Sequence, residues 1–363
     1  MEKSKTLKIV GGGGRNDYID IAKALGMLLV VWGHIKLTGI SNAFVYAFHM
    51  PLFFFLSGMV FSHSRYPSFS CFVKRKFKTL LLPYVLFSVF WWIVWASFSY
   101  ITHAEVESYW NPLLQTLIAQ GSEGFLVHNV PLWFVPCLFV VECMYFFISK
   151  LPDIWNVLIC VFCAILGYFM IYRCSFFDFK LLPWSIEVAL LAIVFYCVGN
   201  LIVEKYGHKK IRDIVDGNKI ISWCGLIVGF IIVYLVACKN GSITMGHSSI
   251  GPYPLLFYIG AFCGVFSMLL LCLLMEDWKW NKENHWTLKS IKWFGMNSFN
   301  AMAIHNPIKG FIVVSVAILF SCSKEMVQSS TGLSIICFLM TLIITVLLMI
   351  GLEWLKKKFA KQR

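Results

Sequence analysis

Ten stretches of about 20 predominantly apolar residues divide this 363-residue chain, and they constrain its fold more than any other feature. A helix of about 20 residues spans the ~30 Å hydrocarbon layer of a bilayer and satisfies its backbone polar groups internally. We therefore expect an all-α, polytopic integral membrane protein with about ten transmembrane helices. The predicted spans are residues 17–36, 44–62, 79–101, 130–149, 154–172, 186–203, 220–238, 253–275, 297–320 and 332–354.

The composition excludes a soluble globular protein. Only 13% of the residues are Asp, Glu, Lys or Arg, whereas soluble domains carry about 25%. The chain therefore has too few charged residues to cover a surface that faces only water. Its formal net charge of +13 could by itself indicate a nucleic-acid partner, but such a role requires basic residues gathered on one soluble face.

Lysine and arginine are instead distributed as expected for ten spans. Of the 31 basic residues, 24 fall in the two terminal tails and the even-numbered connections, five fall on the opposite face, and Lys23 and Lys309 lie inside spans. By the positive-inside bias the richer face is cytoplasmic, and so are both termini. We expect no nucleic-acid partner. The predicted organisation is a cytoplasmic tail (1–16), a transmembrane domain (17–354) and a basic cytoplasmic tail (355–363).

The first span carries Asp20, Lys23 and His34, although an ionisable group at mid-bilayer costs about 2.5 to 3.5 kcal/mol. Lys23 and His34 are eleven residues apart, so on an α-helix they share a face and lie about 16.5 Å apart along the axis. Asp20 precedes Lys23 by one turn and could pair with it. All three side chains are functional candidates. The alternative is that they extend to the lipid headgroups at either end of the span.

A basic cluster precedes the third span, with Lys74, Arg75 and Lys78 among its members. Cytoplasmic topology alone would explain this cluster, but it could also bind an anionic ligand. His49 begins the apolar part of the second span, at the same predicted outer level as His34.

Two further polar residues lie within spans. Glu142 could orient a histidine or bind a sugar hydroxyl, or it could pair with Lys309 or with a residue of another span. His305 precedes Asn306-Pro307, and a proline in a helix frees a carbonyl that a side chain could satisfy. Both interpretations of Glu142 remain open, and for His305 a functional role and this structural role remain open as well.

Several short motifs, in this order along the chain, resemble the membrane-bound acyltransferase-3 family. The resemblance extends from about residue 15 to residue 354. The motifs are Asp20-x-x-Lys23-x10-His34, the run Met50-Pro51-Leu52-Phe53-Phe54-Phe55-Leu56-Ser57-Gly58, the basic cluster before Pro83-Tyr84, Pro131-Leu132-Trp133-Phe134, Phe195-Tyr196-x-x-Gly199 and Ala303-Ile304-His305-Asn306-Pro307.

The resemblance implies a multi-pass protein of the bacterial inner membrane that transfers an acyl group, usually acetyl from acetyl-CoA, to a hydroxyl of a cell-envelope carbohydrate. The expected partners are an extracytoplasmic or lipid-linked carbohydrate acceptor and membrane lipid, a homo-oligomer is compatible with the sequence, and no metal is expected. The family's basic-residue-x10-histidine motif corresponds here to Lys23 and His34, and its Arg-x-x-Arg motif corresponds to Arg75 and Lys78. We expect His34, Lys23 and Asp20 to be catalytic, Arg75, Lys78 and Lys74 to bind the coenzyme, and His49, Glu142, His305 and Trp133 to bind the substrate.

This chain departs from the family's Arg-x-x-Arg motif, because Lys78 stands at the second position and lacks the bidentate fork of an arginine. Two roles of His34 stay open, general base for the acceptor hydroxyl and transient carrier of the acyl group. The outward connection at 102–129 contains glutamates and no lysine or arginine, which favours a neutral or basic acceptor.

Three other functions fit parts of the sequence. A glycerolipid acyltransferase uses the His-x4-Asp spacing that His208 and Asp213 reproduce, but these residues lie in a lysine-rich loop. A transmembrane sugar N-acetyltransferase also uses a histidine in its first span. A transporter or flippase of a lipid-linked sugar is the alternative outside the enzymes, although paired half repeats typical of transporters are not visible.

Overall fold

The computed structural model describes residues 16–35, 39–122, 124–172, 182–277 and 285–360. Within these ranges no strand forms, and ten helical spans are long and apolar enough to cross a membrane. Each overlaps one of the ten predicted segments, so the all-α polytopic fold is confirmed. Residues 1–15 of the predicted N-terminal tail and residues 361–363 of the C-terminal tail lie outside the described residues.

The first five spans alternate with short helical connections. Their elements are α1 (Asp17–Ile35), α2 (Gly39–Tyr46) with α3 (His49–Val60), the short turn η1 (His63–Arg65), α4 (Phe69–Lys76) with the π-helical turn η2 (Phe77–Leu81) and α5 (Leu82–Ile101), α6 (Asn111–Ile118), η3 (Val130–Trp133) with α7 (Phe134–Ile148), and α8 (Asp153–Tyr172).

The second half of the chain supplies five more spans and two shorter helices. The elements are η4 (Pro183–Ser185) with α9 (Ile186–Gly217), α10 (Lys219–Asn240), η5 (Met245–His247), α11 (Pro254–Asp277), α13 (His285–Met296), α14 (Ser298–Leu319), α15 (Lys324–Ser329) and α16 (Thr331–Ala360). The sixth span runs well past its predicted end at residue 203, with a break in helical backbone at Gly207.

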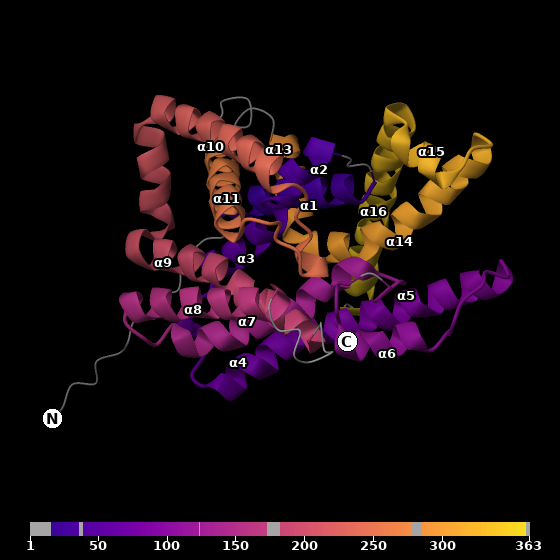
Figure 1. The fold of residues 1–363 in the computed structure, drawn as a ribbon, viewed down its shortest axis with the longest axis horizontal. Helices are drawn as coiled ribbons and strands as arrows, with labels where there is room; N and C mark the ends of the chain where they lie inside the picture. Colours follow the sequence, from indigo (N-terminus) through magenta and orange to yellow (C-terminus); the bar gives the residue numbers. More distant parts are fainter. Residues whose placement is uncertain (1–15, 36–38, 123, 173–181, 278–284, 361–363) are drawn as a thin grey trace.

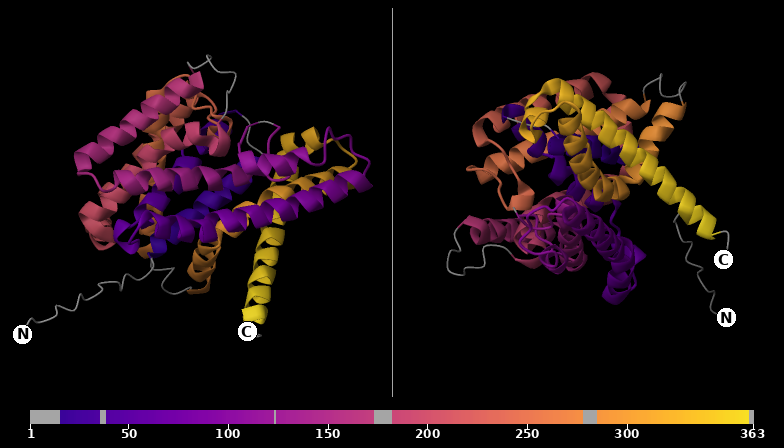
Figure 2. Two further views of the ribbon diagram at one scale, coloured as in Figure 1. Left: turned by 90° about the horizontal axis from the view of Figure 1, so that it is seen from below. Right: turned by 90° about the vertical axis from the view of Figure 1, so that its right-hand side faces the viewer.

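The spans form an inner and an outer set. More than 60% of the residues are buried in the most apolar windows of α1, α2–α3, α7 and α9, against fewer than 30% in those of α5, α8, α10 and α16. Figure 1 shows α1 and α3 between α8–α11 on one side and α14–α16 on the other, and Figure 2 shows α16 running out along one edge. The outer helices carry the exposed Ile, Leu and Phe side chains expected to face lipid.

Two glycines allow α3 and α9 to pack closely. A Cβ atom on Gly58 would collide with the backbone carbonyl of Tyr196, and one on Gly199 would collide with that of Phe55. Each glycine therefore meets the backbone of the other helix. Because lipid tails are as apolar as leucine, such close backbone approach is a main source of helix association in membranes. These are the two glycines of the Leu56-Ser57-Gly58 and Phe195-Tyr196-x-x-Gly199 motifs.

The third span begins with an irregular turn. The basic helix α4 is capped by Ser68, whose hydroxyl accepts a hydrogen bond from the Cys71 backbone N–H. It continues through the π-helical turn into α5, and Pro83 is the second residue of α5. Turns of this kind re-aim the side chains around them and recur at functional sites.

Candidate active site

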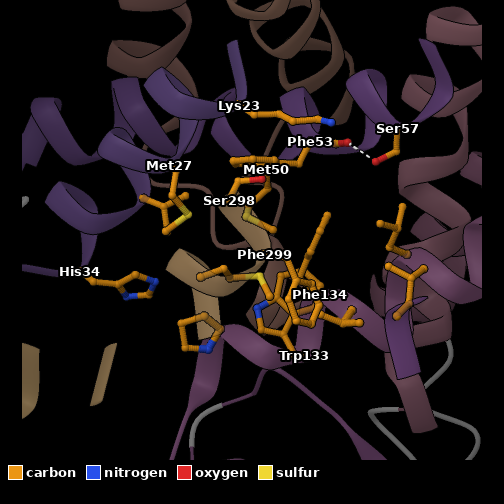
Figure 3. Close-up of a pocket in the computed structure, with 16 residues that line it drawn as sticks. Lys23, Met27, His34, Met50, Phe53, Ser57, Trp133, Phe134, Ser298 and Phe299 are labelled. Carbon is orange, nitrogen blue, oxygen red and sulfur yellow. Dashed lines mark hydrogen bonds between the residues drawn. The ribbon is translucent and has the colours of Figure 1, made fainter. Parts of the chain in front are cut away.

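A cavity of about 200 Å³ lies where α1, α3, α7 and α14 meet. We call it the His34 cavity. Most of its wall is apolar, and Figure 3 shows Lys23 at one end, His34 projecting inward farther along, and Trp133 and Phe134 on the opposite wall. The remaining polar groups in the wall come from Ser57 and Ser298. A largely apolar enclosure with a few placed polar groups is typical of a small-molecule site.

One face of α1 supplies much of this wall. Lys23, Met27, Val30 and His34 follow at intervals of four, three and four residues, and all four line the cavity. Such spacing keeps side chains on one helix face. The shared face expected for Lys23 and His34 is therefore present, and it is directed into protein.

His34 lies against a second histidine. Its ring centroid is 5.3 Å from that of His305, with the two planes inclined at 44°. His305 is fully buried, and its Nδ1 lies 3.0 Å from the Ala301 carbonyl and 2.9 Å from that of Met302. Nδ1 is thus the donor, which leaves Nε2 as an acceptor, and Nε2 has no hydrogen-bond partner within the described residues.

Asn129 satisfies the carbonyl that Pro307 frees. Its Nδ2 donates a 2.7 Å hydrogen bond to the Ala303 carbonyl, four residues before the proline. His305 therefore does not serve that carbonyl. The bond ties the segment before α7 to the middle of α14, next to the histidine pair.

A second, more polar cavity of about 490 Å³ adjoins the other end of α1. Its wall includes Asp20, Lys23, Arg65, Glu204 and His208. We call it the Arg65 cavity. Lys23 also lines the His34 cavity, so the two cavities meet at this one side chain.

The basic cluster has one inward-facing member, which is Lys76. Its Nζ lies 2.6 Å from Oε1 of Glu142, and the glutamate side chain is almost fully buried. Lys74, Arg75 and Lys78 are exposed and line neither cavity. The Arg75 guanidinium instead lies over the ring of Tyr66, next to Arg65 in the chain.

The predicted substrate-binding residues lie in different places. Trp133 lines the His34 cavity, and His305 contacts His34 from outside its wall. Glu142 does not line this cavity, and its ion-pair partner is Lys76 rather than Lys309. His49 is buried beside Tyr46, with Nδ1 3.0 Å from the Val45 carbonyl, and it also lies outside the cavity wall.

His208 and Asp213 do not form a base and acid pair. A ring nitrogen of His208 lies 2.8 Å from the Tyr18 hydroxyl, while Asp213 is exposed. This geometry does not support the glycerolipid acyltransferase alternative.

The sequence profile of the acyltransferase-3 family, described as an acyltransferase domain, matches residues 16–350. The chain belongs to the acyltransferase-3 family. No curated protein and no solved structure matches it significantly. As an acyltransferase-3 protein with ten membrane-spanning candidates, it is a membrane acyltransferase.

The motifs of this acyltransferase-3 protein did not indicate that Arg65 lines a cavity, because in the sequence Arg65 contributes only to the positive charge that indicates topology. A signal was available in its position, since Arg65 follows directly on the span that carries the Phe-rich motif. The His-x4-Asp spacing gave no reason to expect His208 in this cavity wall. Its place in the wall of the Arg65 cavity depends on α9 continuing past its predicted end.

Proposed function

We propose that this protein transfers an acetyl group from acetyl-CoA to a hydroxyl of an extracytoplasmic or lipid-linked carbohydrate, in the inner membrane of a bacterium. The observation that carries the proposal is the position of Lys23, which lines both the Arg65 cavity and the His34 cavity. A donor held in one cavity can reach the other past this single side chain.

The donor enters through the Arg65 cavity. The positive-inside bias puts this end of α1 at the cytoplasm, where acyl-CoA is made. The coenzyme carries several phosphates, which Arg65 and His208 can contact. We therefore assign coenzyme contact to Arg65 and His208 in place of Lys74, Arg75 and Lys78. The side chains of those three residues are exposed and do not line the cavity. Glu204 in the same wall restricts where the phosphates can lie.

His34 acts as general base in the transfer. Its imidazole takes the proton of the acceptor hydroxyl while the new C–O bond forms and the thioester C–S bond breaks. The coenzyme leaves as a thiolate and takes that proton to become the thiol. In the alternative, the imidazole first accepts the acyl group and then passes it to the hydroxyl. The neighbouring His305 keeps the ring of His34 in place in either case.

The test uses purified protein in detergent with labelled acetyl-CoA and a cell-envelope glycan extract. Labelled glycan is expected with the unchanged protein. His34→Gln is expected to reduce transfer by about 10²- to 10⁴-fold, the usual contribution of a general base. His103→Gln is the matched control, because His103 is exposed and lies outside both cavities.

Near-normal transfer by correctly inserted His34→Gln protein would refute the proposed role. Acetyl trapped on protein would favour the relay over the general base. Label on an amine rather than a hydroxyl would identify a sugar N-acetyltransferase. Transport of a lipid-linked sugar without any acetylation would identify the flippase alternative.

A further inference from the structure

A third cavity, of about 350 Å³, is lined by residues that follow His305 in α14. We call it the Lys309 cavity. It lies between the second half of α5, the second half of α14, α15 and the segment before η3. Asn306 lines it, and the preceding residue in α14 is His305, whose ring contacts His34. The residue next to His305 in the chain therefore lines this cavity.

Two cations and no acidic side chain line this cavity. Lys309 is partly buried within a membrane span, and Lys324 is exposed on α15. No carboxylate of the described residues lies within ion-pair distance of either ammonium group. A lysine within a span is costly without a compensating anion. The ammonium groups of Lys309 and Lys324 are therefore available to a negatively charged ligand in this cavity.

Buried polar atoms in the same wall also lack partners. Trp91 and His128 are 6% and 4% exposed. The Trp91 Nε1–H and both ring nitrogens of His128 make no hydrogen bond with the described residues. Buried groups of this kind are normally satisfied. Burial lowers the pKa of His128 to about 4, so at neutral pH its ring presents one donor and one acceptor.

Aromatic rings complete the wall, chiefly those of Trp91 and Trp95. Flat apolar faces together with isolated donors and acceptors suit a sugar, which has apolar ring faces and hydroxyl edges. The two lysines add a requirement for negative charge. This chemistry differs from the neutral or basic acceptor favoured by the acidic loop, since Glu105 and Glu107 of that loop do not line the cavity.

We propose that the Lys309 cavity is the acceptor subsite, and that it selects a saccharide carrying an anionic group, which Lys309 and Lys324 bind while a hydroxyl extends past Asn306 toward His34. The inference rests on the proposed function, because it names the acceptor of that reaction. The anion is a carboxylate in an acidic polysaccharide or a phosphate in a lipid-linked sugar.

Binding is measured on the full-length protein in detergent without acetyl-CoA. The probes are methyl glucuronide, glucose 1-phosphate and the neutral methyl glucoside. The anionic probes are expected to bind about tenfold more tightly than the neutral one, which corresponds to one charge-assisted contact. A preference for glucose 1-phosphate would indicate a lipid-linked source, and a preference for methyl glucuronide an acidic polysaccharide.

Lys309→Met is expected to abolish the preference for the anionic probes and to leave methyl glucoside binding unchanged. Lys324→Gln keeps the test valid if Lys309→Met folds poorly, because Lys324 is exposed, and it should reduce the preference in part. Lys239→Met is the matched control, since Lys239 is exposed, lies over the Tyr253 ring and does not line the cavity.

Equal affinity for charged and neutral probes, or equal loss of both in Lys309→Met, would overturn the inference. These results do not depend on acetyl transfer. Failure of the proposed function would instead appear as absence of labelled glycan in the transfer assay, even with anionic acceptors.

Discussion

The imidazole of His34 packs against that of His305, with 5.3 Å between the ring centroids, although 271 positions separate them in the chain. His305 is held by two backbone carbonyls of its own helix and is fully buried. The ring of His305 is held in place, and it restricts the orientation of the half-buried ring of His34 beside it. We therefore regard His305 as a positioning residue for His34.

A double-mutant cycle tests this relationship. His305→Gln is expected to reduce transfer by about 10- to 100-fold, since small misplacement of a catalytic group is costly. Adding His305→Gln to His34→Gln should cost little more, because residues that act as a unit are not additive. The measurement compares the transfer rates of the unchanged protein, the two single variants and the double variant. Thermal unfolding of each protein is the control for folding. Strictly additive losses would show that His305 acts independently of His34.

The proposed role of the Arg65 cavity in donor binding predicts different effects for two arginines. Arg65→Gln should raise the KM for acetyl-CoA about tenfold with a smaller change in kcat, because a charged hydrogen bond to a phosphate contributes about 1.5 to 3 kcal/mol. Arg75→Gln should change KM by less than about twofold, because the Arg75 guanidinium lies over the Tyr66 ring and does not line the Arg65 cavity. Initial rates at varied acetyl-CoA provide both constants. A larger rise in KM for Arg75→Gln than for Arg65→Gln would show that the coenzyme binds at the Arg-x-x-Lys motif instead.

The crossing of α3 and α9 predicts loss of stability on adding one methyl group. Gly58→Ala and Gly199→Ala should each destabilise by at least about 1 to 3 kcal/mol, because the helices must separate. Gly351→Ala is the control, since nothing lies within 4 Å of a Cβ there and alanine favours helix. Thermal unfolding in detergent measures all three. Similar midpoints for the three variants would show that the crossing tolerates wider spacing.

The ion pair between Lys76 and Glu142 predicts a rescue. Lys76→Met alone should lower the unfolding temperature clearly, because it leaves a buried carboxylate uncompensated, at a cost of about 3 to 5 kcal/mol. Glu142→Gln added to Lys76→Met should restore most of the loss. The KM for the acceptor should stay unchanged in the stable double variant. A raised KM there would indicate that Glu142 binds the sugar.

The spans were predictable because each is a continuous apolar window of sufficient length, and the lysine distribution fixes their number. The shared face of Lys23 and His34 was predictable too, because helical periodicity alone determines it. The contact of His34 with His305 was not, since periodicity within one helix does not say which other helix packs on its face. Motif order indicated that both residues matter but gave no distance between them.

The Arg65 cavity could not be predicted for a related reason. It requires η1 to bring Arg65, and the extended α9 to bring His208, to the start of α1. Hydropathy ended α9 near residue 203, because the rest of the helix is polar. A polar extension of a membrane helix is invisible to a search for apolar windows.

The Lys23 side chain lines both the Arg65 cavity and the His34 cavity. In a bilayer, the protein between two such cavities is also part of the barrier to ions. Cells store energy as ion gradients across the membrane, and an open path from one membrane face to the other would dissipate them. A smaller side chain at position 23 would weaken this barrier between the two cavities. Reconstituted Lys23→Ala protein is expected to conduct protons and to lose acyl transfer. A pH-sensitive dye trapped in proteoliposomes would reveal the proton conduction.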